Sequence, residues 1–193
     1  TSPVLDLYTK GAHEVIGKRS YSENPSIVNE LGCACVKFYK KNKIGTVIKH
    51  IPGHGKANVD SHFKLPVVKN DLSSLKKNDF KCFKKSKSYF AMTAHILYSK
   101  IDNKNNATHS KIIIKEIIRK EIGFKGILIS DDISMKALKY NVVENAKLAL
   151  SAGCNLILYC AGKSDEVKKI LKEMPYIDSF TKKKTSEFYK FLS

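Results

Sequence analysis

Short apolar segments alternate with longer amphipathic ones along most of the chain, and this alternation limits the possible fold more than any other feature. The apolar segments contain β-branched or aromatic residues, and several end in polar groups, as strands do. The predicted strands are Pro3–Leu7, Thr46–Ile51, Tyr89–Ala94, Gly126–Ser130 and Asn155–Tyr159. The predicted helices are Pro25–Lys41, Leu72–Lys84, Ser110–Glu121, Val143–Ala152 and Ser164–Glu173.

Local signals support two of these helices, and the order of the elements predicts the fold class. Asn24 is suited to cap a helix that has Pro25 in its first turn. Four isoleucines share one face of the predicted helix Ser110–Glu121. Strand and helix alternate about five times, which predicts parallel βα units and an α/β fold. Because a complete (β/α)8 barrel has eight such units and about 250 residues, this chain supplies only part of one if it belongs to a barrel.

Length and composition predict one globular domain. The chain has 193 residues, of which 42% are hydrophobic, and this is enough for a buried core. We expect the domain to span residues 1–180 and the Lys-rich residues 181–193 to fray as a tail. The chain lacks an initial Met and enters a predicted strand almost at once, so we expect upstream sequence to be missing. No apolar run approaches the length of a membrane span, and no signal peptide is recognisable. These features, with five cysteines in no zinc or redox spacing, predict a cytoplasmic protein without a membrane partner.

The net charge of +17 suggests binding to a polyanion such as a nucleic acid. The composition of the charge favours a different interpretation. Arg19 and Arg119 are the only arginines, and the lysines are scattered over predicted helices, loops and the tail. The basic residues are not interleaved with aromatic ones, as a base-stacking surface requires. We therefore expect a solvated lysine surface and no specific nucleic-acid partner, and we keep a polyanion-binding module as a less favoured alternative.

The densest group of polar residues follows the predicted strand Thr46–Ile51. The segment Lys49–Gly55 contains two histidines, a lysine and two glycines that allow close backbone approach, and the segment Asp60–His62 follows it. A histidine two residues from an aspartate can share a hydrogen bond with it, and the carboxylate then orients the ring for proton transfer. So many such groups at one strand end indicate a functional site in preference to an ordinary polar loop.

A second polar group follows the predicted strand Gly126–Ser130, which leads directly into Asp131 and Asp132. Adjacent side chains on an extended chain point in opposite directions. One carboxylate can therefore face a cavity while the other forms hydrogen bonds within the loop. From the chemistry alone, the carboxylate that faces the cavity can be a nucleophile, a metal ligand or a helix cap.

The polar motifs occur in the order seen in glycoside hydrolase family 3. The segments that carry the resemblance are Glu14–Tyr21, Lys49–Gly55, Asp60–His62, Met92–His95 and Ser130–Ala137. They are most similar to those of the bacterial cytoplasmic β-N-acetylglucosaminidases of peptidoglycan recycling, and the resemblance covers about residues 1–160. It implies a TIM barrel that is truncated at the N-terminus, with about the last five βα units present.

The resemblance implies a role for each of several side chains. Asp131 is expected to be the nucleophile, His62 the general acid/base and Asp60 the partner of His62. The expected sugar-binding residues are Arg19, Lys49 and His50. His54 and His95 are expected to form the wall of the site, and Asp132 is expected to be structural.

The function that follows is a retaining β-N-acetylhexosaminidase. It is expected to cleave terminal β-linked N-acetylglucosamine from muropeptides through a covalent glycosyl-enzyme, without a metal ion or another cofactor. One alternative is an inactive remnant of this enzyme, or a remnant that requires a complementary N-terminal chain. A less favoured alternative is a metal-dependent hydrolase with the ligands His50, His54, His62 and Asp131.

Overall fold

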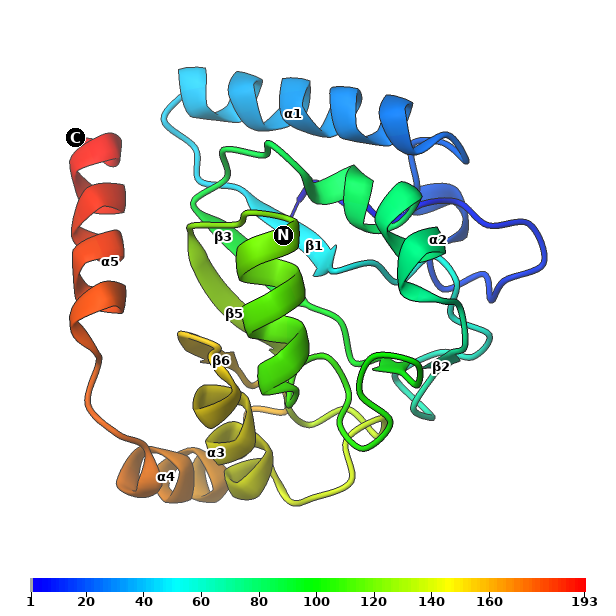
Figure 1. Cartoon of the computed structure of the whole chain (residues 1–193). Coiled ribbons are helices and arrows are strands. Elements are labelled where there is room, and N and C mark those ends of the chain that lie inside the picture. The colour runs from blue at the N-terminus through cyan, green and yellow to red at the C-terminus, as the bar shows by residue number, and fades with distance from the viewer. Residues whose placement is uncertain (1) are drawn as a thin grey trace.

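A parallel four-stranded sheet forms the centre of the structure, a computed structural model that describes residues 2–193 (Figure 1). The spatial order of its strands is β1 (Val47–Ile51), β3 (Phe90–Thr93), β5 (Ile127–Asp132) and β6 (Leu156–Leu158). All three neighbouring pairs are parallel. This arrangement confirms the α/β prediction and four of the five predicted strands.

The first predicted strand, Pro3–Leu7, is present only as an irregular extended segment beside β1. Val4 forms a single parallel bridge with Lys49, and the backbone N–H of Leu5 donates to the Lys49 carbonyl at 2.8 Å. Among the described residues, no strand pairs with the other side of this segment or with the free side of β6. The sheet therefore has two open edges and does not close into a barrel.

Helices surround the sheet, and their bounds agree with the sequence patterns in most places. The α-helices are α1 (Pro25–Lys41), α2 (Leu72–Lys77), α3 (Val142–Ala152), α4 (Ser164–Glu173) and α5 (Ser179–Leu192). The remaining elements are the 3-10 turns η1 (Gly17–Arg19) and η2 (Phe80–Phe83), the π-helix η3 (Ile113–Glu121), and a parallel pair of short strands, β2 (Val67–Val68) and β4 (Leu97–Tyr98). Asn24 caps α1 by accepting a hydrogen bond from the Ser26 backbone N–H, as predicted.

The single helix predicted over Leu72–Lys84 is wrong, because the chain leaves the α conformation at Asn78. The side-chain amide of Asn78 donates to the Ser74 carbonyl at 2.9 Å, which ends the helix. Asp79 then turns inward, is only 2% exposed and pairs with Lys56. The segment consequently divides into α2 and the turn η2.

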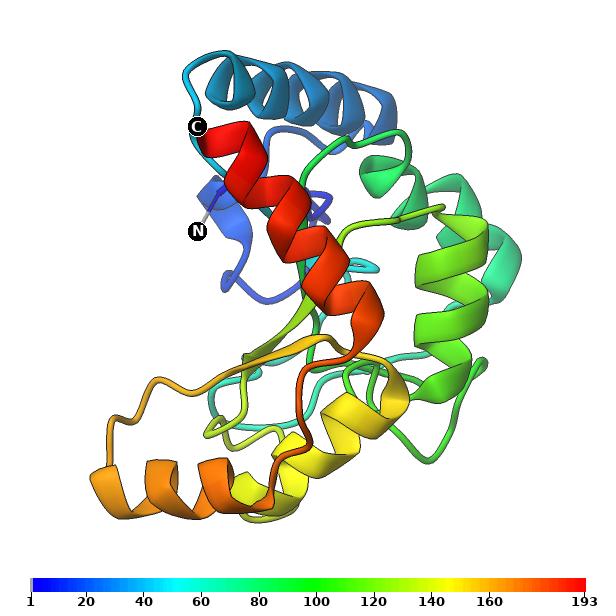
Figure 2. The ribbon, with the colours of Figure 1, turned by 90° about the vertical axis from the view of Figure 1, so that its left-hand side faces the viewer.

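The prediction of a frayed tail over residues 181–193 is also wrong, because most of this segment belongs to α5. Its Phe188 ring packs against Tyr89 and Phe90, with centroid distances of 5.3 Å and 4.8 Å. Phe188 also lies against Gly45, where an added Cβ would be 2.6 Å from the ring. Gly45 precedes β1, and Tyr89 and Phe90 begin β3. Helix α5 thus packs against the amino ends of these strands and crosses in front of the sheet in Figure 2.

Within residues 2–193, no helix combines the length and the apolar character that a membrane crossing requires.

Candidate active site

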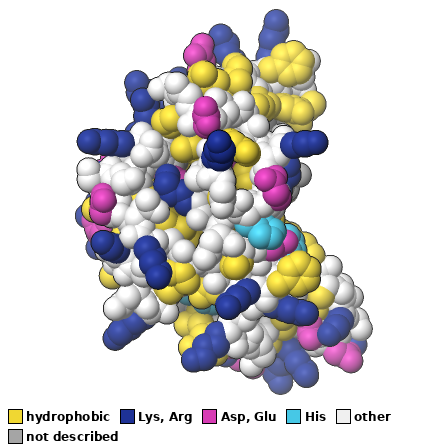
Figure 3. Space-filling model, turned by 90° about the vertical axis from the view of Figure 1, so that its right-hand side faces the viewer, with side chains coloured by type: hydrophobic (Ala, Val, Ile, Leu, Met, Phe, Trp, Pro, Cys, Tyr) yellow, Lys and Arg dark blue, Asp and Glu magenta, His cyan; other side chains and the backbone are white. Residues whose placement is uncertain are grey.

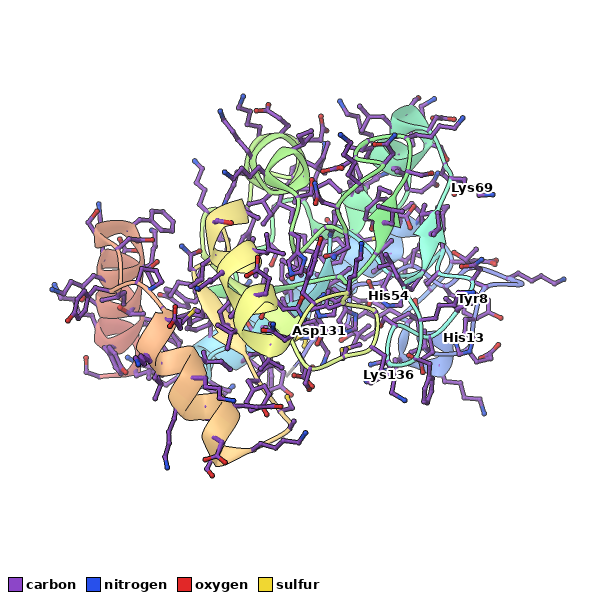
Figure 4. All side chains as sticks on the ribbon, turned by 90° about the horizontal axis from the view of Figure 1, so that it is seen from below. Tyr8, His13, His54, Lys69, Asp131 and Lys136 are labelled. Carbon is purple, nitrogen blue, oxygen red and sulfur yellow. The ribbon has the colours of Figure 1, made fainter. Side chains whose placement is uncertain are left out.

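Polar side chains gather at the carboxyl ends of the strands, where the parallel topology brings them together. Lys49 and His50 lie near the end of β1, His95 follows β3, and Asp131 lies at the end of β5. Figure 4, which shows the molecule from below, places Asp131 and His54 near one another in the middle of the view. The structure therefore brings two of the predicted motifs, some 80 positions apart in the sequence, to one edge of the sheet.

Asp6 organises the β1 side of this cluster, although sequence reasoning assigned it no role. Its carboxylate is fully buried, and its Oδ2 lies 2.7 Å from Nδ1 of His50. Oδ1 accepts from the backbone N–H groups of His54 at 2.7 Å and His50 at 3.1 Å. Burial raises the pKa of Asp6, but His50 and His54 outweigh this effect and the net pKa is lowered. Asp6 is thus an ionised carboxylate that fixes the ring of His50.

The sequence does contain a feature that could have indicated a role for Asp6, since it is a single acidic residue within an otherwise apolar predicted strand. Lone buried charges are costly unless they are paired, so such a residue indicates a partner elsewhere in the fold.

Lys49 and Arg19 are two cations whose charges act on one another. Lys49 is half-buried, and burial lowers the pKa of its ammonium group; the nearby charge of Arg19 lowers it further, while those of Asp131 and Asp6 oppose the shift. Arg19 extends from η1, and its Nε donates to the Val15 carbonyl at 3.0 Å. The exposed guanidinium of Arg19 and the half-buried ammonium of Lys49 are thus neighbouring cations, and the charge of Asp131 acts on the ammonium group.

The two adjacent carboxylates have different surroundings. Asp132 accepts hydrogen bonds from the backbone N–H of Ser134 at 3.0 Å, from its hydroxyl at 2.7 Å and from the Cys160 backbone N–H at 3.1 Å. Asp131 accepts from the Asp132 backbone N–H at 2.9 Å. Asp132 consequently holds the loop after β5 to the end of β6, and Asp131 is the carboxylate whose charge acts on Lys49.

His54 and His95 are buried, and the charge of Asp131 acts on both rings. Burial lowers the pKa of His54 to about 4 and lowers that of His95, and the charge of Asp131 opposes both shifts. The His95 ring lies between the Thr108 hydroxyl at 2.7 Å and the Asp132 carbonyl at 3.0 Å. Both rings are thus neutral at pH 7 and serve to position their neighbours.

His62 and Asp60 form a pair on the loop after β1. Nδ1 of His62 lies 2.8 Å from Oδ1 of Asp60, and the same oxygen accepts from the His62 backbone N–H at 2.9 Å. Burial raises the pKa of Asp60, but its interactions with His62 and His13 outweigh this effect and lower it. The His62 side chain is 62% exposed, and the face of the molecule in Figure 3 has histidine at its surface. The pair can therefore meet a ligand from solvent.

The loop that carries His62 is held in place through Ser61. The Ser61 hydroxyl lies 3.1 Å from Nε2 of the buried His54, and the Ser61 carbonyl accepts from the Ala137 backbone N–H at 3.2 Å. The loop after β1 and the loop after β5 are thus joined directly.

No group of three or more histidine, cysteine, aspartate or glutamate side chains within residues 2–193 is arranged to hold a metal ion. The four residues of the metal-hydrolase alternative, His50, His54, His62 and Asp131, therefore do not form such a group.

Comparisons with known proteins identify relatives of the chain. The chain is 34% identical over 178 residues to a Beta-hexosaminidase of Methylobacillus flagellatus, covering 89% of this chain and 50% of that protein. It is 38% identical over 164 residues to a Beta-hexosaminidase of Neisseria meningitidis serogroup C, covering 82% and 45%. The chain thus spans about half the length of the curated relatives it matches.

Solved structures give the same result. The crystal structure of NagZ from Neisseria gonorrhoeae in complex with N-trifluoroacetyl-D-glucosamine matches with a TM-score of 0.85 and 32% identity, over 100% of this chain and 55% of that one. The likeness confirms that the sheet is part of a TIM barrel. The model of the glycosyl hydrolase family 3 N-terminal domain matches residues 1–182. The chain therefore belongs to glycosyl hydrolase family 3, as its motifs predicted.

Proposed function

We propose that this chain carries the catalytic part of a retaining β-N-acetylhexosaminidase that releases terminal β-linked N-acetylglucosamine from peptidoglycan fragments. The observation that carries the proposal is the difference between the two carboxylates at the end of β5, where Asp132 bonds within the loop and the charge of Asp131 acts on Lys49. The names of the relatives support the same reaction. We also propose that the enzyme acts in the cytoplasm and takes part in peptidoglycan recycling.

In the first step, a carboxylate oxygen of Asp131 attacks the anomeric carbon while the bond to the leaving oxygen breaks. The protonated His62 ring donates a proton to that oxygen, so the leaving group departs as an alcohol. Asp60 orients the ring and faces the charge that the ring carries. In the second step, His62 takes a proton from water, the water oxygen attacks the anomeric carbon, and Asp131 is released. Two displacements at one carbon retain its configuration.

The sugar is held by Arg19, Lys49 and His50 in this proposal. The two cations donate charge-assisted hydrogen bonds to hydroxyl or carbonyl oxygens. The Asp6 carboxylate takes Nδ1 of His50, so Nε2 remains to meet the sugar. The buried hydrogen bond between Asp6 and His50 thus gives the ring one orientation before the substrate arrives.

We further propose that catalysis requires the βα units that this chain does not contain. The sheet has two open edges, and a barrel lacking about three units leaves one side of its site without a wall. The missing units are supplied by a polypeptide segment before residue 1 or by a complementary chain. The alternative of an inactive remnant predicts that adding these units restores no turnover.

The test is hydrolysis of a chromogenic β-N-acetylglucosaminide by the purified chain, alone and with a polypeptide that supplies the missing units. We expect turnover that survives a chelator and is lost in Asp131→Ala. Asp165→Ala, which removes an exposed carboxylate on α4, is the matched control and keeps its activity. Azide restores turnover of Asp131→Ala, because an external anion can attack the anomeric carbon from the vacated side, and the product is an α-glycosyl azide.

Two results contradict the proposal. Loss of turnover on adding chelator supports the metal-dependent hydrolase instead. Absence of turnover from a folded chain under both conditions supports the inactive remnant.

A further inference from the structure

A cavity lies outside the candidate active site, between α1 and residues 84–88, which lead into β3. Its volume is about 440 Å³, and small-molecule sites usually measure about 300–1,000 Å³. In Figure 1, α1 lies along the top of the molecule, and the segment between α2 and β3 passes below it. We call this cavity the lysine pocket, and its lining residues are Cys33, Val36, Lys37, Lys40, Lys85 and Lys87.

The lysine pocket has an excess of positive charge. Four of its six lining residues are lysines, and none of the six is acidic. Neighbouring lysines find acidic partners, since Lys76 and Lys84 both pair with Glu121. Within residues 2–193, however, none of the four pocket lysines forms an ion pair with a carboxylate. The pocket therefore gathers cationic side chains whose charge the described part of the chain does not balance.

The charges of the pocket lie close enough to act on one another and on the pocket floor. Burial lowers the pKa of Lys40, and the charge of Lys87 lowers it further. Burial raises the pKa of the Cys33 thiol, and the charge of Lys85 opposes this shift. Because like charges repel at short range, an anion between these ammonium groups relieves repulsion as well as adding attraction.

The two walls of the pocket are held together by hydrogen bonds at both ends. The side-chain amide of Asn29 on α1 donates to the Lys84 carbonyl at 2.6 Å. At the other end, Nζ of Lys40 donates to the Lys87 carbonyl at 3.1 Å. Helix α1 and residues 84–88 therefore keep a fixed separation, and the cavity is present before a ligand enters.

The backbone at Lys85 has an unusual conformation. Its φ angle is 60°, in the left-handed region that favours glycine. Strained residues of this kind cluster at ligand-binding sites, where the surrounding contacts hold them. Glycine would form the same turn without strain, so the turn places an ammonium group beside the pocket at a cost that glycine would avoid.

These groups favour one class of ligand. Lysine ammonium groups bind phosphoryl oxygens as compact point charges. Several of them around one cavity suit a ligand with several negative charges, which a diphosphate group supplies. The floor of the pocket is apolar by contrast, because Val36 is only 1% exposed and the half-buried Cys33 lies beside it. A nucleic acid instead requires phosphate contacts along an extended basic surface.

We propose that the lysine pocket binds a small organic anion with at least two phosphoryl groups, whose organic part lies against Val36 and Cys33. The pocket adjoins the segment that enters β3, whereas the candidate catalytic groups lie at the carboxyl ends of the strands. It is therefore a second site, and it does not depend on the proposed function.

Titration calorimetry with inorganic pyrophosphate and with adenosine diphosphate tests the charge of the pocket. The chain is used with its missing units supplied. Combining Lys85→Gln with Lys87→Gln removes two pocket charges, and we expect the Kd of both anions to rise by about tenfold or more. The matched control combines Lys182→Gln with Lys183→Gln, which removes two exposed charges from α5. We expect the control to leave both Kd values unchanged.

Alkylation of the cysteines by neutral iodoacetamide shows where the anion binds. Labelling is followed at each cysteine by mass spectrometry, with and without pyrophosphate. A bound anion covers the Cys33 thiol and offsets the charge of Lys85, so we expect labelling of Cys33 to slow by about tenfold or more. Cys160 is exposed and follows β6, at the far ends of the strands, and its labelling rate should not change.

Three results would overturn the lysine pocket as a binding site. The first is the absence of pyrophosphate binding. The second is an equal loss of binding in the two double variants, which indicates diffuse attraction to the basic surface, as for a nucleic acid. The third is binding that leaves the labelling of Cys33 unchanged, which places the anion elsewhere. None of these measurements involves turnover, so the proposed function is judged separately by its own assay.

Discussion

Replacing Asp6 by Asn tests whether a buried carboxylate holds the sugar-binding side of the site together. The substitution keeps the size of the side chain and removes its charge. Oδ1 of Asn can still accept from the backbone N–H groups of His50 and His54. The amide nitrogen then takes the place of Oδ2, which lies 2.7 Å from Nδ1 of His50. The amide N–H of Asn and the Nδ1–H of His50 are then two donors facing one another, unless His50 changes its tautomer.

The expected cost follows from these contacts. A hydrogen bond to a charged group contributes about 1.5–3 kcal/mol, and breaking a buried charge pair costs about 3–5 kcal/mol. Because two of the three donors keep an acceptor, we expect a loss of about 3 kcal/mol, at the lower end of the range for a broken pair. For a chain of this length, 1 kcal/mol corresponds to about 2–4 °C in Tm, so Tm falls by about 6–12 °C.

The pH dependence provides the decisive assay. The pKa of Asp6 is lowered below its ordinary value of 3.8 by His50 and His54, against the effect of burial. A lowered pKa in the folded state means that the carboxylate contributes stability above pH 3.8 and loses it as the pH falls through the folded value. Urea unfolding of both proteins should show a difference between their midpoints at pH 7, and this difference should be smaller below pH 3.8. Equal midpoints at pH 7, or a difference that does not change with pH, would refute this account of the site.

Three further predictions concern the surroundings of the site. In Gly55→Ala the added Cβ lies 1.9 Å from the Leu7 carbonyl oxygen, which cannot rotate away, so the urea midpoint should fall by the equivalent of about 3 kcal/mol. Phe188→Ala removes the aromatic contact of α5 with the sheet, and limited proteolysis should release α5 before the remainder of the chain is cut. Asp132→Ala should cost about 1–3 kcal/mol in chemical denaturation, whereas Asp131→Ala should change stability by less than about 0.5 kcal/mol.

A specific result would contradict each of these three predictions. An unchanged midpoint for Gly55→Ala means that the loop after β1 does not approach the first extended segment as closely as described. Simultaneous cleavage throughout Phe188→Ala means that α5 unfolds together with the sheet. Equal stability losses at the two aspartates mean that Asp131 also holds the loop.

Local patterns predicted the parts of the fold that depend on neighbours in the sequence. The predictions agree with the structure for the strands after residue 46 and for the helices Pro25–Lys41 and Ser164–Glu173. In these elements the spacing of the apolar residues follows directly from which face is buried. The distinct surroundings of Asp131 and Asp132 follow from the alternation of side chains along an extended chain.

Features that depend on distant contacts were not predictable in this way. The partner of Asp6 is 44 positions away, and no local pattern relates the two residues. Helix α5 resembles a solvated tail because Lys182, Lys183 and Lys184 follow one another in it, yet Phe188 and Phe191 pack against Tyr89. Asp79, which turns inward after the break at Asn78, pairs with Lys56, 23 positions away in the sequence.

Because of the position of α5, its effect on the stability of the fold is separate from the activity of the folded molecule, although the two are often coupled in enzymes. Phe188 packs at the amino ends of β1 and β3, and Thr181 accepts a hydrogen bond from Asn155, which precedes β6, while the candidate catalytic groups occupy the opposite ends of the strands. A substitution in α5 therefore alters how many molecules are folded at a given moment but not what each folded molecule does. In a cell, sequence drift in this helix is expected to appear as a change in protein abundance, with the same rate per intact molecule.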